Sequence, residues 1–303
     1  MFRLAHLSDP HLGPLPEPTR MELASKRVIG YLNWRRNRAT SHTSAHLDRL
    51  VADLKAEHPD HIAVTGDLVN LALDAELGPA RAWLDSLGPA TDVSVVPGNH
   101  DAYVPGAGSR ALQAWAPFMC DDNAVSTGVH FPYVRHRGPA AIIGLSSARA
   151  TAPFMATGHF DAAQARDLAV RLEQCRREGL CRIVLIHHPP FREKADWYRR
   201  LVGASRLRNV IRDHGAELVL HGHTHRDHLE WTEGRDGPVP IVGVPSASNA
   251  PGGRRPAARY NLIEIEGSPG DWRLTQRERG LTEANRPVEE IRVRSLAPEG
   301  ALS

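Results

Sequence analysis

The stretch Val93-Ser94-Val95-Val96-Pro97-Gly98-Asn99-His100-Asp101 places a short apolar run directly before a cluster of polar side chains. A continuous rather than alternating apolar run is typical of a strand that is buried on both faces of an α/β sheet. Gly98 permits a sharp turn with positive φ and a close approach of the backbone to a bound ion. The stretch therefore predicts a buried strand that ends at a polar site.

Short apolar runs of the same kind recur along the chain, and the segments between them have helical character. The runs cover residues 4–7, 62–65, 93–96, 141–145, 183–186, 218–220 and 241–244. Ser44 is placed to cap a helix to about residue 57, and Asp161 one to about residue 178, with Gly179 just beyond. Alternating strands and helices predict an α/β layered fold.

Polar clusters follow five of these runs. They are Asp9 with His11, Gly66-Asp67, Gly98-Asn99-His100-Asp101, His187-His188-Pro189-Pro190, and His221-Gly222-His223-Thr224-His225. Ligand sites in open α/β sheets form at the carboxyl ends of the strands, so one face is expected to gather all of them. The sequence therefore predicts one shared site.

Residues 1–275 are predicted to form one domain, with a basic helical insertion at about 19–40. Runs at 260–265, 272–274 and 290–293 read as strands of a second sheet in the same domain. Residues 276–303, rich in Pro and Glu, are assigned to a C-terminal extension.

Composition excludes several classes of function. A net charge of +2 is too small to predict binding of a nucleic-acid polymer. No apolar run approaches twenty residues, and the first residues show no signal-peptide pattern. Cys120, Cys175 and Cys181 lack metal-binding spacing and favour a reducing compartment, so we expect a cytoplasmic protein.

The residue types in the clusters suit a pair of metal ions. Two divalent ions about 3.5–4 Å apart lower the pKa of a shared water and clamp an in-line displacement at phosphorus. One carboxylate must bridge them, and Asp67 is the best candidate. Mixed nitrogen and oxygen ligands suit Mn, Fe, Co or Zn better than Mg or Ca.

The ordered pattern D-x-H, GD, GNH[DE], H and GHxH, intact between residues 9 and 225, resembles the calcineurin-like metallophosphoesterase superfamily. The resemblance implies the metallo-dependent phosphatase fold, a four-layer α/β/β/α sandwich of two mixed β-sheets flanked by helices. It also implies two divalent metal ions, with Mn or Fe favoured over Zn.

Carried over by motif, the resemblance assigns a role to each residue. The first metal would take Asp9, His11, Asp67 and His225, and the second Asp67, Asn99, His187 and His223. A hydroxide that bridges the metals would be the nucleophile. His100 would face the substrate, and Asp101 would hold its imidazole in the right tautomer. His187 is preferred over His188 because the first of such a pair usually ligates.

The substrate is open to three interpretations. No Arg follows Gly66-Asp67, unlike in the protein phosphatases of the superfamily, and the motifs resemble bacterial cyclic-nucleotide and glycerophosphodiester phosphodiesterases. We therefore expect hydrolysis of small phosphodiesters, with cyclic nucleotides leading. The alternatives are a pyrophosphatase acting on a lipid-linked nucleotide of the UDP-diacylglucosamine type, and a non-catalytic protein-binding scaffold, although scaffolds typically lose metal ligands and none is missing here.

The surroundings of the site leave alternatives open. Residues 25–38 mix apolar and aromatic residues with five cations, and they either contact the inner face of an anionic membrane or cover the active site. Tyr103 and His159 are predicted to contact the substrate. His6, His188 and His221 are expected to pack around the site rather than react. Oligomeric state, metal identity and physiological substrate stay open.

Overall fold

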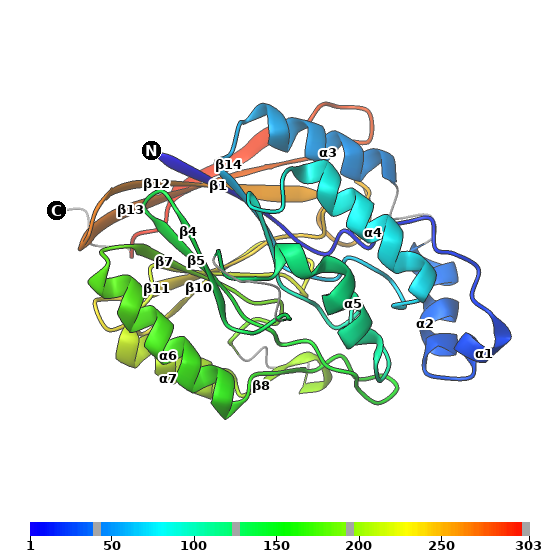
Figure 1. The fold of residues 1–303 in the computed structure, drawn as a ribbon. Helices are drawn as coiled ribbons and strands as arrows, with labels where there is room; N and C mark the ends of the chain where they lie inside the picture. The colour runs from blue at the N-terminus through cyan, green and yellow to red at the C-terminus, as the bar shows by residue number, and fades with distance from the viewer. Residues whose placement is uncertain (39–43, 123–127, 192–196, 299–303) are drawn as a thin grey trace.

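The computed structural model describes residues 1–38, 44–122, 128–191 and 197–298 (Figure 1). Two six-stranded mixed sheets form its centre, in the strand orders β14-β13-β12-β1-β2-β3 and β10-β11-β9-β7-β5-β4. The first sheet contains β1 (Phe2–Leu7), β2 (His61–Val64), β3 (Val93–Val95), β12 (Arg259–Ser268), β13 (Asp271–Gly280) and β14 (Glu289–Ser295). The second contains β4 (Tyr133–Arg137), β5 (Ala140–Gly144), β7 (Cys181–Leu185), β9 (Leu218–His221), β10 (His228–Thr232) and β11 (Val239–Gly243).

The strands that precede the predicted site run parallel. In the first sheet β1, β2 and β3 are parallel, and β12, β13 and β14 continue the sheet with antiparallel pairing. In the second sheet β5, β7, β9 and β11 are parallel, and β4 and β10 form antiparallel edges. The carboxyl ends of β1, β2, β3, β7 and β9 can therefore meet at one edge of the sandwich.

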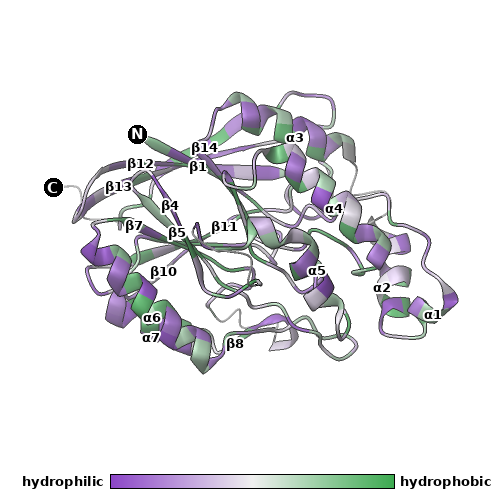
Figure 2. Ribbon diagram, viewed as in Figure 1, coloured by the Kyte–Doolittle hydropathy of each residue, from purple (hydrophilic) through white to green (hydrophobic). Residues whose placement is uncertain are grey.

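Helices cover the outer face of each sheet. On the first sheet lie α3 (Ser44–Ala56) and α4 (Asp74–Leu87), with α5 (Ala107–Trp115) beside α4; on the second lie α6 (Ala162–Arg177) and α7 (Ala204–His214). Figure 2 shows these helices with mixed green and purple faces, as expected for helices that pack on one side only. The four-layer α/β/β/α architecture predicted from the sequence is confirmed.

Two apolar cores hold the layers together. The larger lies between the sheets and continues under α3 and α4, with Leu4, Leu50 and Leu185 fully buried in it. The smaller joins the second sheet to α6 and α7 through residues such as Leu168, Val184 and Leu207. Strands that are apolar on both faces are the reason for the continuous runs in the sequence.

Local signals place the helix ends. The Asp161 side chain accepts a hydrogen bond from the backbone N–H of Gln164 and caps α6, and Gly179 follows its end with φ +71°. Ser44, the predicted cap of the earlier helix, is the first residue of α3. Within the described ranges, no helix combines the length and apolar character needed to cross a bilayer.

The predicted boundary at residue 276 falls inside a strand. β13 continues to Gly280, and β14 pairs with it along the edge of the first sheet. The carboxylate of Asp227 receives ion pairs from Arg292 and Arg294 of β14, at 2.9 and 3.0 Å. The second half of β13 has no apolar pattern because its buried positions are polar: Gln276 donates to Asn261, and Glu278 pairs with Arg259. Residues 299–303 of the predicted extension lie outside the described part.

The predicted insertion forms three short helices at one end of the molecule: α1 (Arg20–Leu23), α2 (Arg27–Asn33) and a π-helical turn (Trp34–Arg38) (Figure 1). A capping box between Thr19 and Glu22 begins α1. The predicted insertion also included residues 39 and 40, which lie outside the described ranges.

Candidate metal centre

The predicted ligands all lie at strand ends and converge below the surface. Each is at most 7% exposed: Asp9, His11, Asp67, Asn99, His187, His223 and His225. They follow β1, β2, β3, β7 and β9, so both sheets contribute. The topology alone therefore brings together residues that are up to 216 positions apart in the chain.

Asp9 and Asp67 lie at the centre of this cluster. His225 Nε2 is 3.1 Å from Asp9 Oδ1, and His187 Nε2 is 3.4 Å from Asp67 Oδ2. His11 Nε2 lies between the two carboxylates, 3.9 Å from Asp9 Oδ1 and 4.0 Å from Asp67 Oδ2. Asp67 thus faces ring nitrogens from both halves of the ligand set, as a bridging carboxylate requires.

The backbone of the cluster adopts a conformation that L-residues rarely take. Positive φ angles between 41° and 68° occur at Asp9, His11, Asp67, His223 and His225. Each such residue costs about 1–3 kcal/mol and persists only where the surroundings hold it. Strain at five of the seven predicted ligands marks these loops as functional.

The two glycines before the ligands serve different needs. Gly66, which precedes Asp67, has φ +88°. Gly98 is not among the residues with positive φ, contrary to the prediction. A Cβ at Gly98 would lie 2.2 Å from Asp67 Oδ1, so the position requires glycine because the Asp67 carboxylate presses against its backbone.

Buried lone pairs point into the centre. In the described part of the chain, Asn99 Oδ1 is buried without a hydrogen-bond partner, and Asp9 Oδ1 and His187 Nε2 are buried against other side chains of the predicted ligand set. The Nδ1–H of His187 donates to the carbonyl of Thr65 at 2.6 Å, so its Nε2 carries the lone pair that faces Asp67. Buried acceptors without donors are costly unless a cation satisfies them, so the residues fit a metal centre.

The electrostatics of the cluster also favour positive charge. Burial opposes a charge on His187, but the carboxylates of Asp67 and Asp9 outweigh it and raise its pKa to about 9. Burial also opposes a charge on Asp67, yet the imidazoles of His187, His100 and His11 keep its pKa well below the usual range. Cations are the ligands that such a centre attracts.

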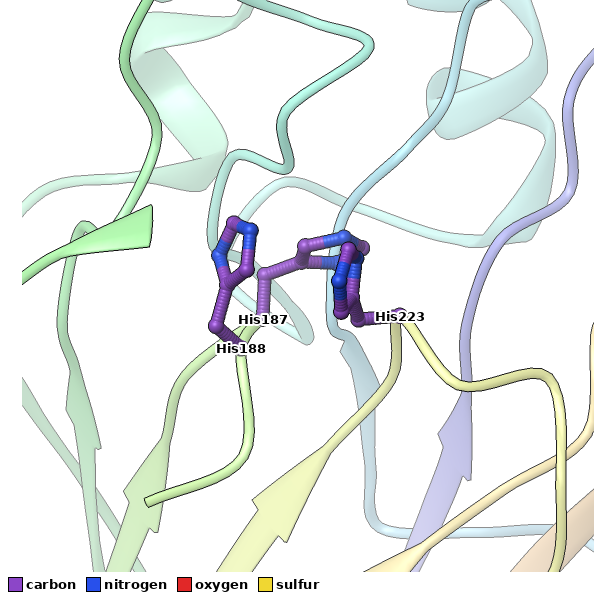
Figure 3. Close-up of side chains that lie close together, drawn as sticks. All are labelled: His187, His188 and His223. Carbon is purple, nitrogen blue, oxygen red and sulfur yellow. The ribbon is translucent and has the colours of Figure 1, made fainter. Parts of the chain in front are cut away.

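His187, His188 and His223 place ring nitrogens within 4.8 Å of one another, from the loops that follow β7 and β9 (Figure 3). His188 uses both nitrogens elsewhere: Nδ1 accepts from the Ser147 hydroxyl at 2.8 Å, and Nε2 donates to the Ala156 carbonyl at 3.1 Å. His223 Nε2 donates to the Arg199 carbonyl at 3.0 Å, which leaves Nδ1 as the ligand atom. This geometry favours His187 and His223 as ligands and gives His188 a supporting role.

The Calcineurin-like phosphoesterase family matches residues 2–227. The chain belongs to this family. The phosphoesterase resembles in fold a dimetal phosphatase from Danio rerio, with TM-score 0.61, 15% identity, and coverage of 96% of this chain and 98% of that one. It also resembles a 5′-nucleotidase precursor from Thermus thermophilus, with TM-score 0.53, 14% identity, and coverage of 97% of this chain and 53% of that one. No curated protein matches it in sequence.

Family membership establishes the reaction class of the chain. The protein is a metal-dependent phosphoesterase whose family binds a dinuclear metal centre, and its His and Asp clusters are able to hold metal ions.

His100 of the phosphoesterase lies at the edge of the cluster, and its ring is held by a carbonyl. Its Nδ1 donates to the backbone oxygen of Asn70 at 2.5 Å, and its own backbone N–H donates to Asp67 Oδ1 at 2.7 Å. His100 also lines the cavity beside the cluster.

Asp101 has a different role from the predicted one. Its carboxylate accepts four backbone N–H groups, from Asp67, Leu68, Val69 and Gly98, at 2.8–3.2 Å. Neighbouring side chains in a tight turn point in different directions, so Asp101 faces the backbone while His100 faces the substrate side. Asp101 thus fixes the loop that carries Asp67, and the carbonyl of Asn70 orients His100.

A cavity of about 480 Å³ opens beside Asn99 and His100 of the phosphoesterase. Tyr103 lines it, as predicted, with its ring centroid 5.4 Å from that of His100. His159 is exposed on the short strand β6 (Gly158–His159) and is not among the residues that line this cavity, so its predicted contact with the substrate stays a prediction. A larger cavity of about 820 Å³ beside β4 and α5 contains none of the predicted ligands.

Residues 26–36 of the insertion form one wall of this cavity. Lys26 lines this wall; its Nζ donates to Thr151 Oγ1 at 2.9 Å and lies 4.5 Å from the Tyr103 ring centroid. The buried guanidinium of Arg27 donates to the carbonyls of Leu71 and Ala72. The sequence analysis included both residues in the segment 25–38 but gave neither of them an individual role.

Proposed function

We propose that the protein is a dinuclear phosphodiesterase that hydrolyses small phosphodiesters, with 3′,5′- or 2′,3′-cyclic nucleotides as the leading substrates. The observation that carries this proposal is the cavity beside His100. Its volume of about 480 Å³ is in the range of small-molecule sites, which span roughly 300–1,000 Å³.

The lining of the cavity suits a nucleotide. Tyr103 and Trp34 offer aromatic faces for a base, and Lys26, Arg36 and Arg199 offer positive charge for a phosphate. The insertion closes one side, which favours a small diester over a phosphorylated protein segment. The absence of an Arg after Gly66-Asp67 supports the same conclusion.

The proposed ligands are Asp9, His11, Asp67 and His225 for one metal and Asp67, Asn99, His187 and His223 for the other. When bound, two ions of Mn or Fe would supply the activated water and neutralise charge at phosphorus. Thr65 and Asp101 hold this set in place, the first through the Nδ1–H of His187 and the second through the backbone of Asp67.

His100 is the proposed general acid. Because Nδ1–H is fixed on the Asn70 carbonyl, a protonated Nε2 faces the cavity and delivers its proton to the leaving oxygen of the diester. Tyr103 beside His100 and Lys26 on the insertion orient the substrate. These groups make the cleavage directional, with the leaving group on the side of His100.

A hydrolysis panel tests the proposal. The metal-loaded protein would be assayed against cyclic nucleotides, bis-p-nitrophenyl phosphate, p-nitrophenyl phosphate and a UDP-linked lipid. The proposal expects the highest kcat/KM for a cyclic nucleotide. Faster turnover of the monoester would contradict it.

One observation favours a second candidate, a pyrophosphatase of a lipid-linked nucleotide. Leu32 and Phe154 line the cavity yet are 47% and 80% exposed, as expected for side chains that meet an acyl chain. The UDP-linked lipid in the panel separates the two candidates. A scaffold without activity is disfavoured because the ligand set is complete. The cytoplasmic location stays a prediction.

A further inference from the structure

Large apolar side chains surround the mouth of the active-site cavity, and all of them are exposed except Trp34, which is half-buried. We define the rim as Leu32, Trp34, Phe154, Trp197 and Tyr198, which come from three separate segments of the chain. Phe154 is 80% exposed, Trp197 63% and Tyr198 38%. All of the rim except Trp197 lines the cavity, and the Trp197 ring lies 6.2 Å from that of Tyr198.

Exposed apolar groups that are rimmed by polar residues mark surfaces that bind a partner. In the remaining described residues the other large exposed apolar side chains are scattered on separate elements: Met1, Met21, Val28, Val170, Val202, Trp231 and Val293. Among the described residues, the rim is the one place where large exposed apolar side chains from distant segments come together around an opening. The partner therefore meets the entrance of the active site.

The charge around the rim selects the kind of partner. The segments that carry it, residues 26–38, 149–156 and 197–200, contain no Asp or Glu. Among their cations Arg35, Arg36, Arg149 and Arg200 are exposed and Arg199 is half-buried. In the sequence one acidic residue, Asp196, directly precedes Trp197. Aromatic side chains that are surrounded by Arg, with few acidic residues, are typical of proteins that lie on anionic lipid.

The attachment of the insertion makes this surface rigid. Arg27 fastens α2 to the carbonyls of Leu71 and Ala72, and a Cβ at Gly30 would lie 2.3 Å from the Tyr103 hydroxyl. The helix is thus packed closely on the domain. A rigid apolar rim loses little conformational entropy when it enters an interface.

We propose that the rim docks the protein on an anionic lipid surface, with the cavity mouth facing the headgroups. The rim aromatics enter the headgroup region, and Arg35 and Arg36 contact lipid phosphates. The active site then receives phosphoesters at the membrane surface. This goes beyond the proposed function, because docking does not depend on which diester is cleaved.

Vesicle co-sedimentation of the full chain tests the proposal without any turnover. The protein is expected to sediment with vesicles of phosphatidylglycerol and phosphatidylcholine, and much less with phosphatidylcholine alone. High salt should weaken the binding, because surface charges are screened. Equal sedimentation with the two lipid compositions, or none with either, would overturn the proposal.

Paired variants locate the surface. Trp197→Ser is expected to lower the vesicle partition coefficient about tenfold, and Arg36→Gln about fivefold. Trp231→Ser, an exposed tryptophan on β10, is the matched control and should change nothing. An equal loss in Trp231→Ser, or none in Trp197→Ser, would refute the assignment of the rim. If the wild-type protein sediments with anionic vesicles but does not hydrolyse cyclic nucleotides, the proposed function fails and the docking proposal stands.

Discussion

The two walls of the active-site cavity differ in burial, backbone conformation and chain origin. The metal wall contains Asn99 and His100, and behind it lie the other predicted ligands, at strand ends from two sheets. The seven predicted ligands are at most 7% exposed, and five of them are in the left-handed region. The wall opposite consists of short helices and loops, and several of its aromatic side chains are exposed. The comparison indicates that the rigid sheets support the strained geometry that chemistry needs, whereas the insertion determines which molecules arrive.

The two walls meet in the loop of residues 70–73, which follows β2. Asn70 holds His100 through its carbonyl, and Arg27 of the insertion binds the next two carbonyls. The carboxylate of Glu76 also fixes this loop, because it accepts hydrogen bonds from the backbone N–H groups of Asn70, Leu71 and Leu73. If the comparison is right, changes in the metal wall should affect kcat and metal content, and changes in the insertion should affect KM.

The largest effect is expected for Asp67→Ala. The variant should lose both metals, and kcat should fall by more than about a thousandfold, beyond the 10²–10³ of a single electrostatic donor. Metal analysis and single-substrate kinetics measure this. Asp74→Ala, at an exposed ion pair with Arg110, is the control. Retention of two metals per chain would refute the bridging assignment.

His100→Ala should keep the metals and lower kcat by about 10²–10⁴-fold for diesters with poor leaving groups. Diesters with good leaving groups need less protonation, so their loss should be smaller. A series of aryl diesters of graded leaving-group pKa measures the slope. A uniform loss across the series would exclude the general-acid role.

Asp101→Asn should destabilise the fold by about 1–3 kcal/mol, because the new amide NH₂ would face backbone N–H donors. Urea unfolding of the metal-free protein measures the free energy of unfolding. Asp213→Asn, exposed on α7, should leave it unchanged. Unaltered stability together with altered tautomer signals of His100 would restore the originally predicted role.

The smallest effect is expected at Lys26. Burial lowers the pKa of its ammonium to about 8, so the charge is present below that pH and is lost above it. KM for an anionic diester should therefore rise about fivefold between pH 7 and 9.5. Lys26→Met should show the raised KM at both pH values, and Lys55→Met should behave as the wild type. If KM of Lys26→Met still rises between pH 7 and 9.5, the titrating group is not Lys26.

Much of the metal wall could be predicted from the sequence. An apolar run followed by Asp, Asn or His indicates the end of a buried strand. Because parallel strands bring their carboxyl ends to one edge of a sheet, these residues are expected to lie together. The direction of a side chain within a turn has no such signature, which is why Asp101 was assigned to the wrong neighbour. Likewise, the second half of β13 lacks an apolar signature, because Gln276 and Glu278 fill its buried positions, and β14 has no buried residue that a hydropathy pattern could show. The position of the insertion on the domain depends on how Gly30 and Arg27 pack. This packing has no recognisable pattern in the sequence.

The pairing of β14 has a practical consequence for shortened versions of the protein. Arg292 and Arg294 hold Asp227, which is two residues beyond His225. A chain that stopped at residue 275 would lose half of β13 and all of β14, so the unpaired edge of β12 would invite aggregation. It would also lose the ion pairs that hold the loop of the predicted ligands His223 and His225. The family match ends at residue 227, so the residues that make these ion pairs lie outside it. The minimal catalytic unit is therefore longer than its motifs.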